Sequence, residues 1–316
     1  MSLAIAILNY NGADLLKRFL PSVLQHSNAA TIYVIDNAST DHSKDLLEAD
    51  FPTVKWIGLD QNYGYAEGYN MGITQIDETL ICLLNSDVEV TANWTTQMVA
   101  LFDAQPLAAM AQPKIKDLNN PDYFEYAGAA GGYLDLMGLP YCRGRVGKTC
   151  ERDTGQYNDA VQVTWASGAC LFIRKEAFTT LGGFDPSFFM HFEEIDLCLR
   201  AQSSGYQVWA VGTSEVLHLG GGSLAAESSR KLYYNIRNSL LTYTKNLTLL
   251  PLLWLYVVRA AFDTTLVLYF MIQLKFDHIR AIMRAYDDFS ICFRKAIKAR
   301  KHTLNPLRCF SVLVRF

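Results

Sequence analysis

The chain has 316 residues, of which 50% are hydrophobic and 19% are charged, a composition that excludes a disordered or fibrous protein. This length suits one large domain or one domain with an appendage. The net charge of -3 conceals an asymmetry, because residues 273–316 contain ten Lys and Arg against three Asp and Glu. A protein divided into an acidic body and a basic end is unlike a uniform nucleic-acid binder, so we expect no nucleic acid among its partners.

The first 90 residues alternate short apolar runs with helical patterns. Strands are predicted at 3–8, 31–35, 54–59 and 79–84, and helices at 15–25 and 43–49. This alternation indicates an α/β domain with a mostly parallel sheet. Ligands of such sheets bind beyond the carboxyl ends of the strands, so the polar clusters that end the strands are the candidate site. These clusters are NYNG at 9–12, DNASTD at 36–41 and NSDVE at 85–89.

The second cluster and the stretch after the third strand suggest contacts with a nucleotide. Asp36 ends an apolar strand, where an acid can accept hydrogen bonds from a base or ribose. Residues 39–41 offer N-caps to the next helix, and plain capping stays open as their role. In NYGYAEGYNMG, three glycines beginning at Gly64 recur every four residues and share one face of a helix. Such a face permits close approach of another element or of a phosphate-bearing ligand.

The sequence LICLLNSDVEV favours a metal site at a strand end. If the segment is extended, alternation points Asn85, Asp87 and Glu89 to the same side. Such hard oxygen ligands suit Mg²⁺ or Mn²⁺ carrying a diphosphate, although a polar turn is the open alternative. His218 follows another apolar run in VLHLGGGS. A lone His after a strand is more often structural, but the metal implied by Asp87 makes a role as a further ligand equally open.

The middle of the chain suggests a loop region that covers the site. Residues 114–161 lose periodicity and suggest an extended loop region, before VTWASGACLFIRKEAF predicts a strand leading into a helix.

Residues 247–274 are strongly apolar, but Arg259 and Asp263 interrupt them. A charge at a bilayer centre costs about 2.5 to 3.5 kcal/mol, which disfavours a plain membrane span. An interfacial segment or hairpin is favoured, because anionic lipid attracts the basic tail. A buried helix pair with a solvated basic face is the alternative.

The stretch HFEEIDLCLR at 191–200 contains the strongest candidate for a catalytic group. At 100° per residue, Glu193, Asp196 and Arg200 share a polar face, with Asp196 and Arg200 as an i,i+4 pair. Glu194 falls within the apolar arc of the same helix. A carboxylate there must be paired, metal-bound or raised in pKa, and a raised pKa suits a general base. Acids favoured by the helix dipole explain the other two carboxylates but not Glu194.

The order of these motifs resembles that of the family 2 glycosyltransferases, which have the A-type glycosyltransferase fold. The resemblance rests on ILNYNG, VIDNASTD, NYGYAEGYNMG, LLNSDVEV, GGFDPSFFMHFEEIDLCLR, VLHLGGGS and YYNIRNSLL, and spans roughly residues 3–245. In detail the chain is similar to the rhamnosyltransferase-like branch of bacterial polysaccharide assembly enzymes. The resemblance implies an α/β catalytic domain over 1–245, with a mostly parallel sheet flanked by helices. Residues 246–316 would form a C-terminal extension, first apolar and then basic, that associates with a membrane.

The resemblance also assigns roles to residues. It implies an inverting transferase that binds its nucleotide diphosphate sugar through Asn9, Asn11, Asp36, Asn62, Gly64, Asn85 and Ser86. Asp87 matches the last acid of the family's metal-binding DXD motif, here Asn-Ser-Asp, and would hold Mg or Mn together with His218. Glu193 and Glu194 match the acidic pair whose second member is the base, so geometry and resemblance choose Glu194 independently. Trp165, Glu193, Asp196 and Arg200 are expected to contact the acceptor or to support the site.

The resemblance favours dTDP-rhamnose as the donor, with a UDP-hexose or UDP-galactofuranose as the alternative. The expected acceptor is a glycan or a lipid-linked glycan, and the expected location is peripheral, on the cytoplasmic side of the inner membrane. One sugar per visit is expected, because the chain has no processive QxxRW motif. An oxidoreductase or methyltransferase is disfavoured, since no glycine fingerprint follows the first strand. The presence of both Asp87 and Glu194 argues against a non-catalytic sugar-nucleotide-binding subunit.

Overall fold

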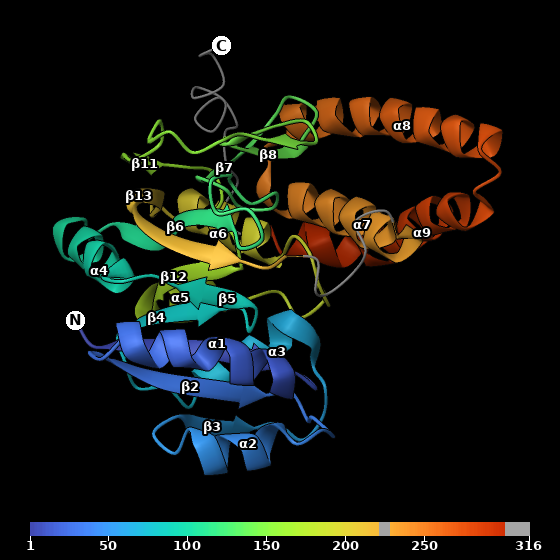
Figure 1. Ribbon diagram of the computed structural model, residues 1–316. Helices are drawn as coiled ribbons and strands as arrows, with labels where there is room; N and C mark the ends of the chain where they lie inside the picture. The colour runs from blue at the N-terminus through green and yellow to red at the C-terminus, as the bar shows by residue number, and fades with distance from the viewer. Residues whose placement is uncertain (221–227, 301–316) are drawn as a thin grey trace.

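The computed structural model describes residues 1–220 and 228–300. A central β-sheet is covered by helices on both faces, and three C-terminal helices project from one side of it (Figure 1). The strands that run parallel to one another have their carboxyl ends on the side from which these helices project (Figure 1).

The N-terminal half of the sheet is parallel, as the sequence predicts. Its order is β3 (Lys55–Gly58), β2 (Ala30–Asp36), β1 (Leu3–Asn9) and β4 (Leu80–Leu84). The four predicted strands are therefore confirmed. The helices that connect them are α1 (Ala13–His26), α2 (Ser43–Asp50) and α3 (Gly64–Ile73). The register aligns Asn9 with Asp36 and Asp36 with Gly58, so the strands end level with one another.

The other half of the sheet mixes directions. The strand β12 (Cys170–Arg174) runs antiparallel to both β4 and β6 (Ala108–Asp117), and β13 (Gln207–His218) runs parallel to β6. The short strands β5 (Val88–Val90) and β11 (Ala160–Gln162) pair antiparallel with β13. The predicted α/β architecture is thus present, with a sheet that is parallel in its first half and mixed in its second.

Two apolar cores lie on the two faces of the sheet. The helices α1, α2 and α4 (Trp94–Ala104) cover one face through residues such as Leu16, Leu47 and Met98. The helices α3, α5 (Lys175–Leu181) and α6 (Glu193–Ser203) cover the other. A central strand buried on both faces has no polar side to show, which explains the uninterrupted apolar run of β4.

The segment expected as a loop over residues 114–161 is only partly irregular. It contains the end of β6 and the short strands β7 (Gly132–Leu134), β8 (Pro140–Cys142), β9 (Arg145–Val146) and β10 (Thr149–Cys150), and it runs into β11. These strands form small antiparallel ladders of two or three residues per strand. Elements this short display no readable alternation, so the sequence pattern missed them.

The C-terminal helices are α7 (Ser229–Asn246), α8 (Leu249–Ile272) and α9 (Phe276–Lys298). A small core of Ile236, Leu240, Ile282 and Ala285 joins α7 to α9. The expected division after residue 245 falls at the end of α7, although α7 packs on both α6 and α9. Residues 221–223 of the VLHLGGGS motif and residues 301–316 of the basic tail lie outside the described residues.

The helix α8 buries its two charged residues and exposes an uncharged face. Arg259 Nη2 lies 3.2 Å from Asp263 Oδ1, and the Tyr286 hydroxyl of α9 donates to Asp263 Oδ2 at 2.8 Å. On the opposite face Leu250 is 80% exposed and Val257 is 68% exposed. By length and composition alone, α8 could cross a membrane. The charges that interrupt the apolar sequence therefore do not lie on the surface that the helix presents.

Replacing Asp263 by Ala would leave Arg259 buried without its carboxylate. The free energy of unfolding is expected to fall by about 3 to 5 kcal/mol, the usual cost of removing one partner of a buried ion pair. Urea denaturation followed by tryptophan fluorescence measures this change. The matched control is Thr264→Ala at the neighbouring exposed position, for which a change within about 0.5 kcal/mol is expected. Equal effects of the two substitutions would contradict the assigned role of the pair.

Candidate active site

The polar ends of four strands meet at one edge of the sheet. The strands β1, β2, β4 and β13 all run in the same direction, and β12 is antiparallel to them. Asn9, Asp36 and His218 end three of these strands, and Asp87 follows the fourth by three residues. The carboxyl edge expected from the sequence is therefore the place where these side chains gather.

Asp36 is buried and held by a hydrogen-bond cluster between the first two loops. Its Oδ1 accepts from Asn9 Nδ2 at 2.9 Å and from the Ser39 hydroxyl at 2.5 Å, and its Oδ2 accepts from the Ser39 N–H at 2.9 Å. The Asn11 N–H donates to the same Ser39 hydroxyl, and Asn11 Oδ1 accepts from the Thr40 N–H at 2.7 Å. A carboxylate has about four acceptor positions, so Asp36 retains one for a ligand.

A second buried polar residue, Asn37, fixes the start of α3. Its Nδ2 donates to the Gly64 carbonyl at 2.9 Å, and its Oδ1 accepts from the Tyr63 N–H at 3.0 Å. Asn62 Oδ1 accepts from the Gly64 N–H at 2.9 Å. Gly64 has φ +74, and a Cβ there would lie 2.8 Å from the ring of Phe189. The predicted residues Asn62 and Gly64 thus shape the site through the backbone.

The metal candidates Asp87 and His218 are adjacent, but not for the reason expected. His218 Nε2 lies 3.1 Å from Asp87 Oδ1. Residues 86 and 87 form a turn, with Val88 N–H donating to the Asn85 carbonyl, so the expectation of an extended segment with three parallel side chains is wrong. Glu89 instead belongs to β5, whose pairing with β13 brings the turn beside His218. Tertiary pairing, which local alternation cannot encode, decides the direction of these side chains.

The surroundings of His218 favour positive charge. Burial by itself lowers the pKa of His218, but Asp87 and Glu125 outweigh burial and raise this pKa to about 10. His218 Nδ1 lies 3.7 Å from Glu125 Oε1 and is buried without a hydrogen-bond partner. Within residues 1–220 and 228–300, no cluster of three or more His, Cys, Asp or Glu side chains is arranged to hold a metal ion. Asp87 and His218 therefore fit a divalent cation only as two ligands of a shell that diphosphate oxygens and water would complete, and His218 would first have to lose its proton, because an imidazolium has no free lone pair.

The acidic helix α6 is more deeply buried than its helical wheel suggested. Glu193 and Asp196 are buried, whereas Glu194 is half-buried. The predicted polar face of Glu193, Asp196 and Arg200 is therefore largely packed inside the molecule. The helical wheel gives the angle of each residue but not its neighbours, and Asp196 on this face contacts Lys245 and Asn246 of α7.

The adjacent carboxyls of Glu193 and Glu194 both resist ionisation. Burial raises the pKa of Glu194 to about 7. Burial, and then the charge of Glu194, raises the pKa of Glu193 well above its usual value. One Oε2 atom of each carboxyl is buried without a hydrogen-bond partner. The start of α6 thus offers a proton acceptor near neutral pH and two unsatisfied oxygens that a substrate could engage.

Asp196 joins α6 to α7 through ion pairs. Its Oδ2 accepts from Arg200 Nε at 2.8 Å, which confirms the predicted i,i+4 pair. Its Oδ1 lies 2.8 Å from Lys245 Nζ and accepts from Asn246 Nδ2 at 2.9 Å. Lys245 also lies 2.7 Å from Asp185 Oδ2. Asp196 and Arg200 therefore hold α6 in place.

The residues directly before α6 adopt a strained backbone. His191 and Phe192 have φ values of +66 and +73, which cost about 1 to 3 kcal/mol each for residues with a Cβ. Asn238 of α7 is fully buried, and its Nδ2 donates to the carbonyls of Met190 and His191 at 2.9 and 2.8 Å. This amide holds the turn that aims Glu194.

Sequence reasoning missed Glu125, Asn37, Ser39 and Asn238. Asn37 and Ser39 lie within the quoted DNASTD cluster, and their position after a strand was a usable signal. Glu125 lies in the aperiodic segment 114–161, and no sequence signal marked it. Trp165 is buried, donates from Nε1 to the Tyr133 carbonyl at 2.9 Å and covers Gly132, where a Cβ would collide with its ring. This buried position favours a role of Trp165 in supporting the site over direct contact with the acceptor.

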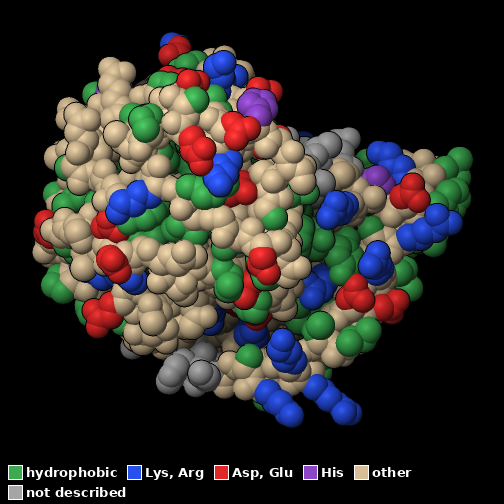
Figure 2. All heavy atoms as spheres, turned by 90° about the horizontal axis from the view of Figure 1, so that it is seen from below, with side chains coloured by type: hydrophobic (Ala, Val, Ile, Leu, Met, Phe, Trp, Pro, Cys, Tyr) green, Lys and Arg blue, Asp and Glu red, His purple; other side chains and the backbone are tan. Residues whose placement is uncertain are grey.

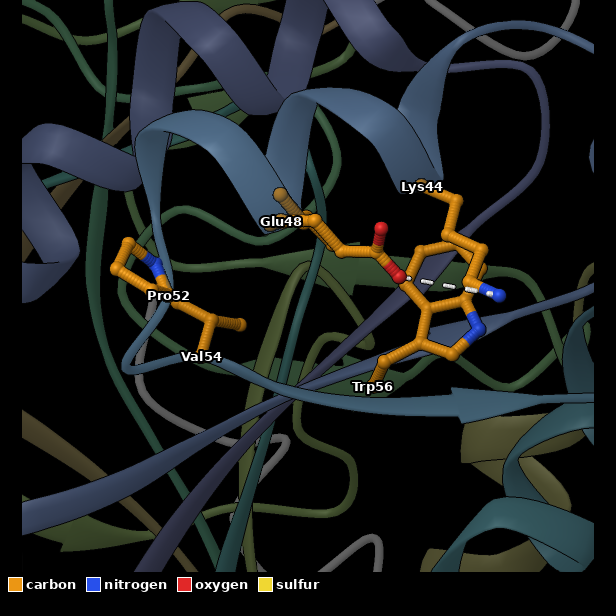
Figure 3. A pocket seen from close by; sticks show the side chains of 6 residues that line it. Lys44, Glu48, Pro52, Val54 and Trp56 are labelled. Carbon is orange, nitrogen blue, oxygen red and sulfur yellow. Dashed lines mark ion pairs between the residues drawn. The ribbon is translucent and has the colours of Figure 1, made fainter.

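A hollow of about 220 Å³ lies away from this edge, between α2 and β3 (Figure 3). It is lined by Lys44, Leu47, Glu48, Pro52, Val54 and Trp56. Lys44 and Glu48 form an exposed ion pair at 3.8 Å across it. Trp56 lies two residues before the strand's carboxyl end, and no polar side chain of the candidate site lines the hollow.

Comparison with known proteins agrees with this geometry. The model of glycosyl transferase family 2 matches residues 4–182. The chain belongs to glycosyl transferase family 2. It is 29% identical over 239 residues to the N-acetylglucosaminyl-diphospho-decaprenol L-rhamnosyltransferase of Mycobacterium tuberculosis, covering 68% of this chain and 75% of that protein. It is 26% identical over 248 residues to the dTDP-rhamnosyl transferase RfbF of Shigella flexneri, covering 75% and 78%.

Solved structures show the same fold. GalNAc-T7 with UDP, GalNAc and Mn²⁺ superimposes with a TM-score of 0.63 at 19% identity, over 78% of this chain and 48% of that one. Family membership makes this chain a glycosyltransferase, and the carboxyl edge of its sheet is the candidate active site.

Asn238→Ala should loosen the strained turn before α6. The carbonyls of Met190 and His191 would lose their donor, at an expected cost of about 1 to 3 kcal/mol in the free energy of unfolding. Hydrogen exchange at residues 190–194 should accelerate in the variant, and mass spectrometry measures it. Asn235→Ala, on the same helix at a half-buried position, is the control. Unchanged exchange in Asn238→Ala would show that this amide does not hold the turn.

Proposed function

We propose that this family 2 glycosyltransferase transfers L-rhamnose from dTDP-rhamnose, with inversion, to a hydroxyl of a lipid-linked glycan in cell-surface polysaccharide assembly. The names of its relatives from M. tuberculosis and S. flexneri support the sugar and the donor. The observation that carries the reaction is the half-buried Glu194 at the start of α6, with a pKa raised to about 7. A UDP-hexose or UDP-galactofuranose donor is the second candidate, because the solved neighbours include complexes with UDP and UDP-GlcNAc.

The donor nucleotide would lie at the first two strand ends. The remaining acceptor position of Asp36 can take an N–H of the base or a ribose hydroxyl. Asn9 and Asn11 hold that carboxylate and its loop in place. Asn85 and Ser86 lie in the turn before Asp87, close to the expected position of the diphosphate.

Glu194 would act as the general base. Its carboxylate removes the proton from the acceptor hydroxyl as the oxygen attacks the anomeric carbon. The bond between that carbon and the diphosphate oxygen breaks, and its electron pair leaves with the nucleoside diphosphate. Asp87 and His218 would hold a divalent cation, Mg or Mn, which when bound offsets negative charge on the leaving diphosphate. Glu193 stays beside the base, and burial and then the charge of Glu194 raise the pKa of Glu193 itself.

We also propose peripheral contact with the cytoplasmic side of the inner membrane. The uncharged outer face of α8 and the basic residues of α9 support this proposal. Figure 2 shows Lys and Arg side chains beside hydrophobic ones on the part of the molecule that projects to the right. An acceptor anchored in lipid would meet the active site at such a surface.

Nucleotide release across a panel of dTDP-, UDP- and GDP-sugars tests the donor. With a GlcNAc-diphosphate-polyprenol acceptor present, dTDP-rhamnose is expected to give release at least tenfold faster than any other donor. A UDP-sugar that performs best would replace rhamnose with the second candidate. Absence of transfer with every donor, by a chain that binds one of them, would favour a non-catalytic subunit.

Glu194→Gln should abolish transfer while donor binding survives, because an amide cannot accept the proton. In the parent chain the kcat/KM should rise with pH and level off above about pH 7, since the base must be deprotonated and its pKa is raised to about 7. Steady-state kinetics between pH 5 and 9 and calorimetry of donor binding measure both. Glu193→Gln is the control, and it should retain transfer. Full activity in Glu194→Gln would remove the base assignment.

A further inference from the structure

A cavity between the first turns of α7 and α9 has no role in the reaction as described so far. Its volume is about 410 Å³, within the range of about 300 to 1,000 Å³ that is usual for small-molecule sites. Three of its lining residues are Arg230, Arg280 and Arg284, and Asp277 is its one lining acid. Tyr233 and Tyr234 supply its aromatic wall. A cavity with three guanidinium groups against one carboxylate selects an anion.

The existing contacts of these arginines leave room for a ligand. Arg280 Nη1 lies 3.3 Å from Asp277 Oδ1, but both side chains are about 80% exposed, so this pair contributes little. Arg284 Nε lies 3.7 Å from Asp288 Oδ2, but the Arg284 side chain is 77% exposed, so this pair is also weak. Arg284 lies over the ring of Tyr233, and Arg230 lies over that of Tyr234, at 5.4 and 5.9 Å from the ring centroids. Stacking fixes the planes of the guanidinium groups, which bind phosphate oxygens in pairs.

One wall of the cavity is continuous with the active site. The ring of Tyr234 stacks on that of Phe189 at 6.3 Å, and the Phe189 carbonyl accepts from the Tyr65 N–H at the start of α3. Burial, and then the charge of Lys231 next to the cavity, lower the pKa of His191 to about 4. One turn further along α7, Asn238 holds the turn before Glu194. The cavity therefore adjoins the segment that carries the base.

The opposite end of the cavity adjoins an apolar tip. The turn between α8 and α9 directly precedes the lining residue Asp277. In this turn Ile272 is 84% exposed, Leu274 is 72% exposed and Phe276 is 57% exposed. Figure 1 shows this turn at the far end of the projecting helices, with the first turns of α7 and α9 behind it.

We propose that this cavity binds the diphosphate group of a polyprenyl-type acceptor, an inference that rests on the proposed transfer to a lipid-linked glycan. An apolar chain, a diphosphate and a sugar hydroxyl follow one another in such a molecule. The apolar tip, the arginine cavity and Glu194 follow one another in the protein in the same order. The arginines position the acceptor, and its hydroxyl then reaches the base.

Binding of farnesyl diphosphate to the full chain in detergent tests the site without any glycosyl transfer. The double variant Arg280→Gln with Arg284→Gln should weaken binding at least tenfold. The control is Arg294→Gln with Lys298→Gln, which removes the same charge from exposed positions later in α9 and should change binding less than twofold. Because all four side chains are exposed, the parent melting temperature is expected in both variants. Equal losses in the two variants would overturn the proposal, since bulk charge would then explain binding.

Two further measurements show whether the cavity binds a prenyl diphosphate or a phospholipid headgroup. Farnesol, which lacks the diphosphate, should bind equally to the parent and to both variants, and an equal loss for farnesol and farnesyl diphosphate would refute phosphate recognition. Sedimentation with phosphatidylglycerol vesicles should fall by similar factors in both variants. If the cavity variant loses vesicle binding alone and keeps farnesyl diphosphate, the cavity binds a phospholipid headgroup and the proposal fails. Inactivity with every donor would contradict the proposed function but leave this binding result standing.

Discussion

The helix α6, which carries Glu194, depends on the ion pairs and hydrogen bonds that fix it to α7. Asp196 is fully buried and shares its two oxygens among Arg200, Lys245 and Asn246. A buried carboxylate is stable only with such partners, so the start of α6 cannot move without breaking them. The same helix α7 supplies Asn238, which holds the strained turn at His191 and Phe192. A helix outside the sheet thus decides where Glu194 points.

This dependence links catalysis to the C-terminal helices. The helix α7 lies between the active site and the projecting pair α8 and α9, and it contributes side chains to both sides. Arg237 donates to the Ser187 carbonyl on the catalytic side, and Tyr233 donates to Asp288 of α9 on the other. A membrane contact on α8 and a transfer reaction at the sheet would therefore act through one rigid helix. Residues 246–300 are therefore packed against the rest of the chain through α7.

Acidic and basic side chains gather in two different regions of the molecule. Carboxylates gather at the sheet edge and at α6, where Asp87 and Glu125 enclose His218 and a raised pKa keeps Glu194 protonatable near neutral pH. Arginines gather at α7 and α9. A negatively charged donor with its cation suits the first region, and a negatively charged acceptor suits the second. The two substrates would therefore approach from different sides of α6.

The sequence by itself determined the strands, the carboxyl edge and the identity of the chemical groups. Apolar runs of five to seven residues have one stable place, a buried strand, and polar residues directly after them must emerge at one edge. On the helical wheel of α6, Glu194 falls within the apolar arc, and this position follows from residue spacing alone.

Tertiary structure decided what packs on each surface. The turn at Asp87 follows from pairing between β5 and β13, and the burial of Glu193 and Asp196 follows from α7. The partner of Arg259 and Asp263 is α9, and the arginine cavity is formed only where α7 meets α9. These are contacts between distant segments, and local periodicity carries no information about them.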